Sequence, residues 1–389
     1  MNIHTAMPAA FFRRFAISLI LFLAAFCCFQ PAQAAPPSES TQSASATAMK
    51  LIRFGADPKI PFDAQAAAAL VDYVLAAKPS RETALPTVNK APGAYYEHDT
   101  KIGFAGFLQY SYTSQIPSIL TSPSSLRYSL WSHEQGKLQK LPASWPAVAP
   151  NGKPTIVRGM QRDGITPDLN TGIYYEYDLR RTLVLFHYKG KQVLFTISNQ
   201  VDVSEVGKKG FILGSDEDWN YYYSGEPGSA RTGLGWVKSY IYDYFSVGVF
   251  VENGATVRSG TFQWIRAGWN GVNFVKPEHI IRGFKRNAVN SKTILESPHL
   301  PSPARIAAAY QRLSSLPPTE LRERYEALEE ARLSLAVQSG KVNADKTKKP
   351  NSSAGVPKEQ MVEELMLEYW KIALGKPSLV TKQIVLGMK

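Results

Sequence analysis

Apolar residues recur with helical spacing in two parts of the chain, near its start and after residue 275. Within residues 64–77 they return every three or four positions, and Asp63 stands where an N-cap residue is expected. The same spacing predicts four further helices in the second part, at residues 276–297, 302–316, 318–337 and 358–374. We therefore expect helices at both ends of the folded chain.

Between residues 95 and 275 the pattern changes to short apolar runs separated by Gly, Pro, Asn and Asp, which is typical of β-strands. We expect strands at 101–116 and 125–133, and two or three strands within 170–201 with a turn at Lys189-Gly190-Lys191. The Pro-rich stretch 143–168 has no clear period, so we interpret it as a long surface connection.

This order, one helix, a block of strands and then helices, favours an α+β fold, with an antiparallel or mixed β-sheet module flanked by an N-terminal helix and a C-terminal helical region. The predicted organisation has six parts. They are a signal peptide (1–34), a flexible tether (35–50), a β-rich domain with its N-terminal helix (51–275), a helical region packing on the sheet (276–340), a basic flexible linker (341–357), and a C-terminal helix with its tail (358–389).

The first residues have the pattern of a secretory signal peptide. Arg13 and Arg14 precede an apolar run at 16–29, and Ala32 and Ala34 suit signal peptidase. We expect cleavage after Ala34 and a periplasmic protein with no stable transmembrane segment. The alternative is a retained membrane anchor, but the run is shorter than the roughly 20 residues that span a bilayer. A twin-arginine signal and a lipoprotein signal are weaker alternatives.

Both cysteines, Cys27 and Cys28, lie in this signal, so the mature chain would contain no disulfide and no thiolate ligand. The formal net charge of +12 falls to +10 without Arg13 and Arg14. A basic exported protein could meet an envelope glycan or another anionic polymer. No nucleic-acid, nucleotide, metal or hydrolase motif is present, so we expect no nucleic-acid partner, no metal and no cofactor.

Paired carboxylates are the main indication of an enzyme. Asp216, Asp218 and Glu226 lie in a loop that also holds Trp219 and Tyr222. A glycoside hydrolase needs two carboxylates about 5–10 Å apart beside a surface on which a sugar can stack. The alternative is an acidic turn in water whose aromatic side chains pack into the sheet.

The pair Asn253-Gly254 between alternating runs predicts a β-hairpin with these two residues as its loop. In that register Asp243 and Arg266 are diagonal neighbours on an otherwise apolar face, so we expect them to form an ion pair. The opposite face carries a strip of three tyrosines that could stack sugar rings, be covered by helices or form a protein interface. These are Tyr240, Tyr242 and Tyr244. Trp269, after the second strand, is either an exposed anchor or a plug between sheet and helices.

The sequence therefore favours an exported, non-catalytic cell-envelope or glycan-associated binding module. A carboxylate-dependent hydrolase of envelope glycan is one alternative. A periplasmic scaffold or assembly protein is the other, because an apolar stripe within 358–374 could dock a protein partner or fold back on the domain.

Overall fold

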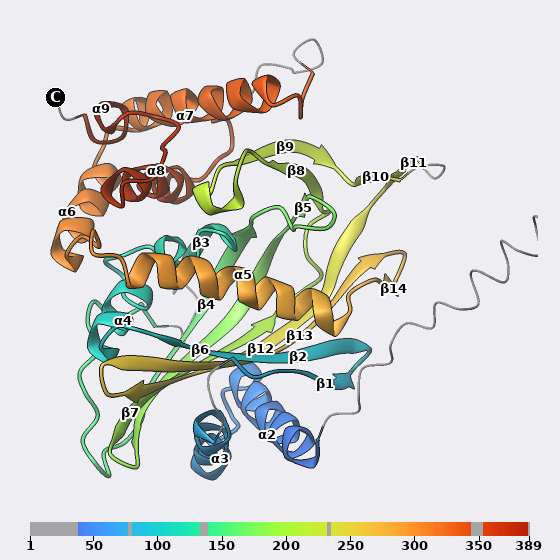
Figure 1. The fold of residues 1–389 in the computed structure, drawn as a ribbon, viewed down its shortest axis with the longest axis vertical. Helices are drawn as coiled ribbons and strands as arrows, with labels where there is room; N and C mark the ends of the chain where they lie inside the picture. Colours follow the sequence, from blue (N-terminus) through green and yellow to red (C-terminus); the bar gives the residue numbers. More distant parts are fainter. Residues whose placement is uncertain (1–37, 77–79, 133–138, 232–234, 344–352, 388–389) are drawn as a thin grey trace, which may run out of the picture. The chain divides into compact units, whose positions relative to one another are not determined.

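The structure is a computed structural model, and it describes residues 38–76, 80–132, 139–231, 235–343 and 353–387. The predicted signal peptide and its cleavage site lie outside these residues. The described chain has an α+β fold, as predicted, in which helices cover both faces of a curled antiparallel sheet (Figure 1).

The main sheet has nine strands in the order β1-β2-β13-β12-β7-β6-β4-β3, with β14 paired to β13. Neighbouring strands of this sheet all run antiparallel in the described part of the chain. The strands are β1 (Glu82–Val88), β2 (Ala91–Thr100), β3 (Leu126–Ser132), β4 (Thr155–Ile165), β6 (Glu176–Tyr188), β7 (Lys191–Gln200), β12 (Ser239–Asn253), β13 (Thr256–Trp269) and β14 (Val272–Asn273). The runs predicted at 125–133 and 170–201 are strands. The apolar run in β6 lies inside the sheet, as expected of a strand covered on both faces.

One face of the sheet, which we call the α2 face, is covered by α2 (Glu39–Ala56) and α3 (Ala64–Leu75). Its core consists of β-branched and aromatic residues, among them Val184, Phe195, Val249 and Phe262. Helix α3 begins after the predicted cap, because the Asp63 side chain accepts a hydrogen bond from the Ala66 amide at 2.9 Å.

Helix α2 corrects the expectation of a flexible tether at 35–50. Ser38 caps the helix, and its buried residues include Thr41, Ala44, Ser45 and Ala48, at helical spacing. These side chains are small and partly polar, so they give no apolar stripe in the sequence. Their size brings the helix close to the sheet, and a Cβ on Gly55 would lie 2.4 Å from Ile197.

The other face, which we call the α5 face, is covered by α4 (Phe104–Ser111), the short 3₁₀ helix η1 (Ser118–Thr121) and α5 (Pro277–Leu295) (Figure 1). The strand predicted at 101–116 is therefore wrong. Phe104, Phe107, Leu108 and Ser111 are the buried positions that define a helical period of three to four residues. In a run of eight residues this period is easily mistaken for the apolar density of a buried strand.

The C-terminal helices are α6 (Pro303–Ser314), α7 (Pro318–Gln338), α8 (Lys358–Ala373) and α9 (Lys382–Leu386). Helix α8 contacts α6, α7, α9, η1 and β3. Its predicted apolar stripe is buried within this core, and its members are Met361, Leu365, Met366, Tyr369 and Trp370. The stripe has folded back on the domain, so it is not available to dock a partner through 358–374.

Two small sheets, β5-β8-β9 and β10-β11, complete the fold. Their strands are β5 (Ile173–Tyr174), β8 (Lys208–Ile212), β9 (Tyr221–Pro227), β10 (Ser229–Arg231) and β11 (Gly235–Val237). A short 3₁₀ helix, η2 (Asp216–Asp218), lies between β8 and β9. No helix among the described residues is both long enough and apolar enough to cross a membrane.

Strand β4 corrects the surface connection expected at 143–168. Its α5-face positions include Gly159, Gln161 and Asp163, so the apolar alternation of a strand is missing. Packing explains why residue 159 is a glycine, because a Cβ there would lie 2.2 Å from the indole ring of Trp131. Gln161 borders a cavity.

Candidate ligand-binding cavity

A cavity of about 440 Å³ lies between the α5 face of the sheet and the helices that cover it. The sheet contributes side chains from β2, β3, β4, β6, β12 and β13, and α4, η1, α5, α6 and α8 contribute others, together with loop residues at 112–117, 122 and 140–141. Many of these side chains carry hydroxyl groups, including Ser111, Ser129, Ser259 and Thr261. The α5 face is thus apolar toward the helical core and polar where it meets the cavity.

Arg181 brings a cation to the cavity wall. It shares the α5 face of β6 with Leu183 and Leu185, and its Nη1 donates to the hydroxyl of Ser198 on β7. Its Nε is buried without a hydrogen-bond partner. No described carboxylate forms an ion pair with Arg181. Its neighbour Arg180 points to the opposite face, where Nη1 donates to the carbonyl of Ala56 at 3.0 Å.

His98 and Ser111 leave further buried polar atoms without partners, namely His98 Nδ1 and Ser111 Oγ. The His98 ring stacks on Tyr96 with 5.9 Å between centroids. Burial lowers the pKa of His98 to about 4, with a smaller contribution from Lys292. The imidazole is therefore neutral at physiological pH and can both donate and accept a hydrogen bond.

Glu363, on α8, brings a buried carboxyl group to the same cavity. Its Oε2 accepts from the Ser129 amide at 2.7 Å, and no hydrogen bond to its Oε1 is present among the described residues. Burial, assisted by nearby Asp163, raises the pKa of Glu363 well above its usual value. The group is therefore neutral over a wider pH range than an exposed glutamate.

Aromatic side chains form part of the cavity wall. Phe107 lies 5.0 Å from Phe250 and 5.6 Å from Tyr112, measured between ring centroids. Burial raises the pKa of Tyr112 to about 12, so its phenol stays protonated. Trp131 lies over Gly159, and its indole N–H donates to the Gln139 carbonyl at 2.9 Å. The cavity thus combines aromatic faces with hydroxyl, imidazole, carboxyl and guanidinium groups.

Comparison with protein-family models, with curated proteins and with solved structures found no match for this chain. The chemistry of the cavity must therefore be argued from its own side chains. In the described part of the chain, no three His, Cys, Asp or Glu side chains are grouped so that they could hold a metal ion.

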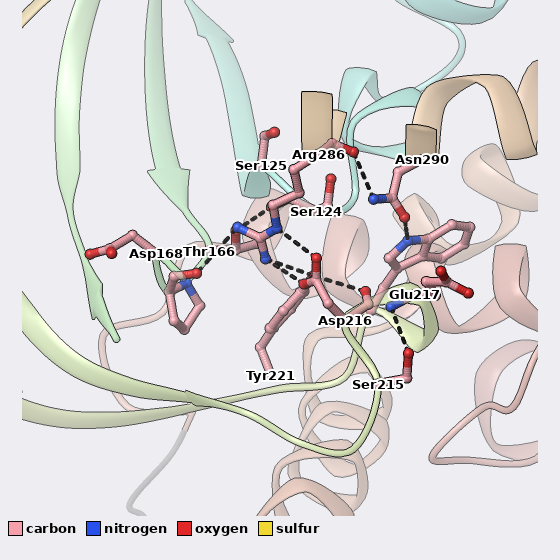
Figure 2. A network of polar contacts seen from close by, with 12 residues as sticks. Ser124, Ser125, Thr166, Asp168, Ser215, Asp216, Glu217, Tyr221, Arg286 and Asn290 are labelled. Atoms are coloured by element: carbon pink, nitrogen blue, oxygen red, sulfur yellow. Dashed lines mark hydrogen bonds and ion pairs between the residues drawn. The ribbon is translucent and has the colours of Figure 1, made fainter. Parts of the chain in front are cut away.

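Asp216 is the first of the three carboxylates that the sequence indicated as candidate catalytic groups. Its side chain is held by Arg286 of α5 in a polar network (Figure 2). Arg286 donates to both of its oxygens, at 2.7 Å from Nε and 2.5 Å from Nη2. The Tyr221 hydroxyl donates to Oδ1 at 2.8 Å. A bidentate pair of this kind positions the loop before β9 on the helix.

The residues in the rest of that acidic loop do not share one cleft. Asp218 is half-buried in η2, and Glu226 is exposed at the end of β9. Trp219 is buried, with its indole N–H 2.5 Å from Asn290 Oδ1, and Tyr222 stacks on Phe211. Glu226 borders a second hollow, which is separate from the main cavity. None of the loop carboxylates lines the main cavity.

The predicted hairpin forms, but its loop is shifted by one residue. Asn253 pairs with Thr256, so the loop is Gly254-Ala255 rather than Asn253-Gly254. Gly254 has a φ of +65°, and Asn253 and Ala255 do not have positive φ. Glycine at the first loop position is the preference of a type II′ turn, whereas the predicted register assumed a type I′ turn.

The shift places Asp243 directly opposite Arg266, and the predicted ion pair forms between them. Arg266 Nε lies 2.5 Å from Asp243 Oδ2. The pair is partly exposed, with 22% of the Arg266 side chain and 36% of the Asp243 side chain accessible, so it is less buried than expected.

The three tyrosines do not form one continuous strip, because the pairing of β12 with β13 is irregular between Ile241 and Asp243. Tyr240 and Tyr242 contact each other, with 6.1 Å between ring centroids. Tyr244 instead packs on Tyr177, at 5.9 Å. All three are half-buried.

Trp269 is half-buried and packs edge-to-face on Phe274 at 4.7 Å, at the β13–β14 end of the sheet. It therefore contacts its own hairpin, and it does not line the main cavity. This contact tests neither of the two roles expected for Trp269, an exposed anchor or a plug between sheet and helices.

The residues that define the cavity were not selected from the sequence. One signal was available: alternation in β6 places Arg181 on the same face as Leu183 and Leu185, so a charge interrupts an apolar face. Glu363 and His98 gave no comparable signal. Their cavity positions depend on contacts between strands and helices far apart in sequence.

Proposed function

We propose that this chain is an exported, non-catalytic binding protein that holds a small hydroxyl-rich ligand, such as a fragment of envelope glycan, in the main cavity. The observation that carries the proposal is a set of polar atoms at the cavity that lack partners within the protein. His98 Nδ1 and Ser111 Oγ are buried without hydrogen bonds among the described residues. Unpaired buried polar groups are costly, and a ligand's hydroxyl groups could supply the missing partners.

The size and lining of the cavity support the same proposal. About 440 Å³ lies within the range of roughly 300–1,000 Å³ that small-molecule sites occupy. Aromatic rings such as Phe250 and Tyr112 offer apolar faces to the carbons of a sugar, while Thr261 and Ser259 offer hydroxyl groups to its oxygens. Export to the periplasm is part of the proposal and is supported by the signal-like pattern of residues 13–34.

The proposal is tested by titrating the purified protein with N-acetylglucosamine, its β-1,4 dimer, glucose and glucuronate, with binding followed by NMR. Thr261→Phe should fill part of the cavity and abolish binding of every sugar that the wild-type protein binds. Val272→Phe is the matched control, because it enlarges a side chain of similar shape on the exposed strand β14. Absence of binding by the wild-type protein, or binding that survives Thr261→Phe, would contradict the proposal.

A hydrolase remains the second candidate function, and one observation favours it. Glu363 is a carboxyl group at the cavity wall with a raised pKa, which is the property of a general acid in glycoside hydrolysis. This moves the alternative away from Asp216 and Glu226. If the β-1,4 dimer were cleaved by the wild-type protein and not by Glu363→Gln, the enzyme would replace the binding protein as the better account.

A further inference from the structure

Arg181, the cation on the cavity wall, has no ion-pair partner in the described part of the chain. Arg127, Arg258 and Arg286 each form an ion pair with a carboxylate. Arg181 forms none with any described residue, although it is only partly accessible to solvent. A guanidinium group withdrawn from bulk water without an anion carries a desolvation cost that a bound anion would offset.

The hydrogen bonds of Arg181 leave one edge of the guanidinium group without an acceptor. Nη1 donates to Ser198. Nε is buried without a partner, and no hydrogen bond from Nη2 is present among the described residues. The Nε–Nη2 edge is one of the two edges with which arginine binds the two oxygens of a carboxylate.

The carboxyl groups near Arg181 do not form an ion pair with it. Asp163 is near enough for Arg181 to lower its pKa, against the larger effect of burial, which raises it, but the Asp163 side chain accepts its hydrogen bonds from Ser129 and Gln161, both at 2.7 Å. Glu363, on the helix that closes the cavity, also has a raised pKa. The phenols of Tyr112 and Tyr244 are protonated at neutral pH, because burial raises the pKa of each.

At the edge of the cavity the charges are balanced. Lys140 and Glu359 line it with opposite charges, and both are exposed. His98 is neutral at physiological pH. Among the described residues that line the interior of the cavity, away from this edge, Arg181 is therefore the only cation.

We propose that the ligand of this cavity carries a carboxylate group and that Arg181 binds it, which makes an acidic sugar the ligand class that fits. A single guanidinium edge matches a single carboxylate in charge and geometry. The hydroxyl groups and aromatic rings of the cavity then contact the sugar ring. This inference rests on the proposed function, since it names the ligand class of the same cavity.

The test compares glucuronate with glucose, which differ at one carbon, and uses sodium acetate as a carboxylate without a sugar. Arg181→Met removes the guanidinium group. Arg180→Met is the matched control, because it removes the adjacent arginine from the opposite face. Binding is followed by NMR, including the Nε–Hε signal of Arg181, which Arg181→Lys identifies by its disappearance.

We expect the wild-type protein and Arg180→Met to bind glucuronate about tenfold or more tightly than glucose, as a charge-assisted hydrogen-bonded pair would. Arg181→Met should lose that preference and bind glucuronate no more tightly than glucose. The Nε–Hε signal of Arg181 should shift with glucuronate and with acetate, but not with glucose. Glucose-6-phosphate should bind less tightly than glucuronate if the site is specific for a carboxylate.

Equal binding of glucose and glucuronate by the wild-type protein would overturn the inference and leave the proposed function standing. A preference for glucuronate that persists in Arg181→Met would also overturn it. A response of the Arg181 signal to acetate without binding of any sugar would support the carboxylate site and contradict the glycan proposal. If the Nε–Hε signal of Arg181 shifted with neither acetate nor glucuronate, the inference would be overturned.

Discussion

At the scale of single residues, the cavity is distinguished by ionisable groups whose surroundings favour the uncharged form. Burial is the main cause in both cases: it raises the pKa of Glu363 and lowers the pKa of His98, and each change favours the neutral form of the side chain. Elsewhere the fold pairs its buried charges. Glu364, on the same helix as Glu363, accepts from Arg127 at 2.9 Å and from Arg332. Buried polar atoms without a partner also occur away from the cavity, among them Arg81 Nε, Glu97 Oε1 and Trp370 Nε1, so what sets the cavity apart is that several such atoms border one space.

The shift of Glu363 predicts how stability depends on pH. Its folded-state pKa is raised, so the folded chain binds the proton more tightly than the unfolded chain. The contribution to stability is complete below about pH 4.5 and is lost as pH rises through the folded pKa. Glu363→Gln removes this loss and can keep the hydrogen bond from the Ser129 amide through its own carbonyl oxygen.

Glu363→Gln should therefore become more stable relative to the wild type as pH rises above about 4.5. The difference should grow by up to about 1.4 kcal/mol per pH unit and level off above the folded pKa. Urea unfolding between pH 4 and 8 measures it. A difference that does not change with pH would show that Glu363 is not held in its neutral form.

At the scale of elements, long periodic helices and well-spaced strands could be predicted, while α4 was mistaken for a strand and α2 and β4 were missed. Helix α2 was missed because its buried face consists of small and polar residues such as Ala44 and Ser45. Strand β4 was missed because Gly159 and Gln161 occupy its inward positions. In both cases the local pattern reflects what the element packs against, and that partner is distant in sequence.

Two hairpin turns also show how far structure can be predicted from the local sequence. The loop Lys189-Gly190 joins β6 to β7 as the sequence indicated, with Lys189 at the unfavourable φ of +48°. The Lys189 ammonium lies 2.8 Å from Asp72 of α3, a contact that helps to hold the turn. The loop of the second hairpin was predicted one residue too early. Gly254 can be the second loop residue of a type I′ turn or the first loop residue of a type II′ turn, and the sequence does not distinguish the two.

The position of helix α8 in the core leads to a testable prediction. Its apolar stripe was expected either to dock a partner or to fold back on the domain, and the second arrangement is observed: Leu365 and Trp370 are 0% exposed and belong to the core that also contains Leu183 and Leu194 of the sheet. Deletion of residues 358–389 should therefore expose that core and abolish cooperative unfolding. Leu365→Asp should act in the same way, since it buries an unpaired charge.

Near-ultraviolet circular dichroism and binding of a hydrophobic dye measure this effect. Glu359→Ala on the exposed side of α8 is the control, and it should leave both signals unchanged. A truncated chain that retained the native spectrum and a sharp melting transition would restore the view of α8 as an independent segment.

At the scale of the whole molecule, the α+β class and the order of helices and strands followed from hydrophobic periodicity. The cavity did not, because it exists only where Arg181 of β6, Ser111 of α4 and Glu363 of α8 are brought together. These residues are separated by many elements, and no local pattern marks their proximity. The sequence placed its candidate chemistry at Asp216 and Glu226, where the carboxylates are conspicuous but do not share the cavity.

A crystal structure of the protein soaked with glucuronate would show whether this cavity is a ligand site. We expect a sugar ring in the cavity beside Phe250 and Thr261, with its carboxylate about 3 Å from the guanidinium group of Arg181. A cavity that holds only ordered water at a saturating concentration of glucuronate, or a sugar bound elsewhere on the protein, would contradict it.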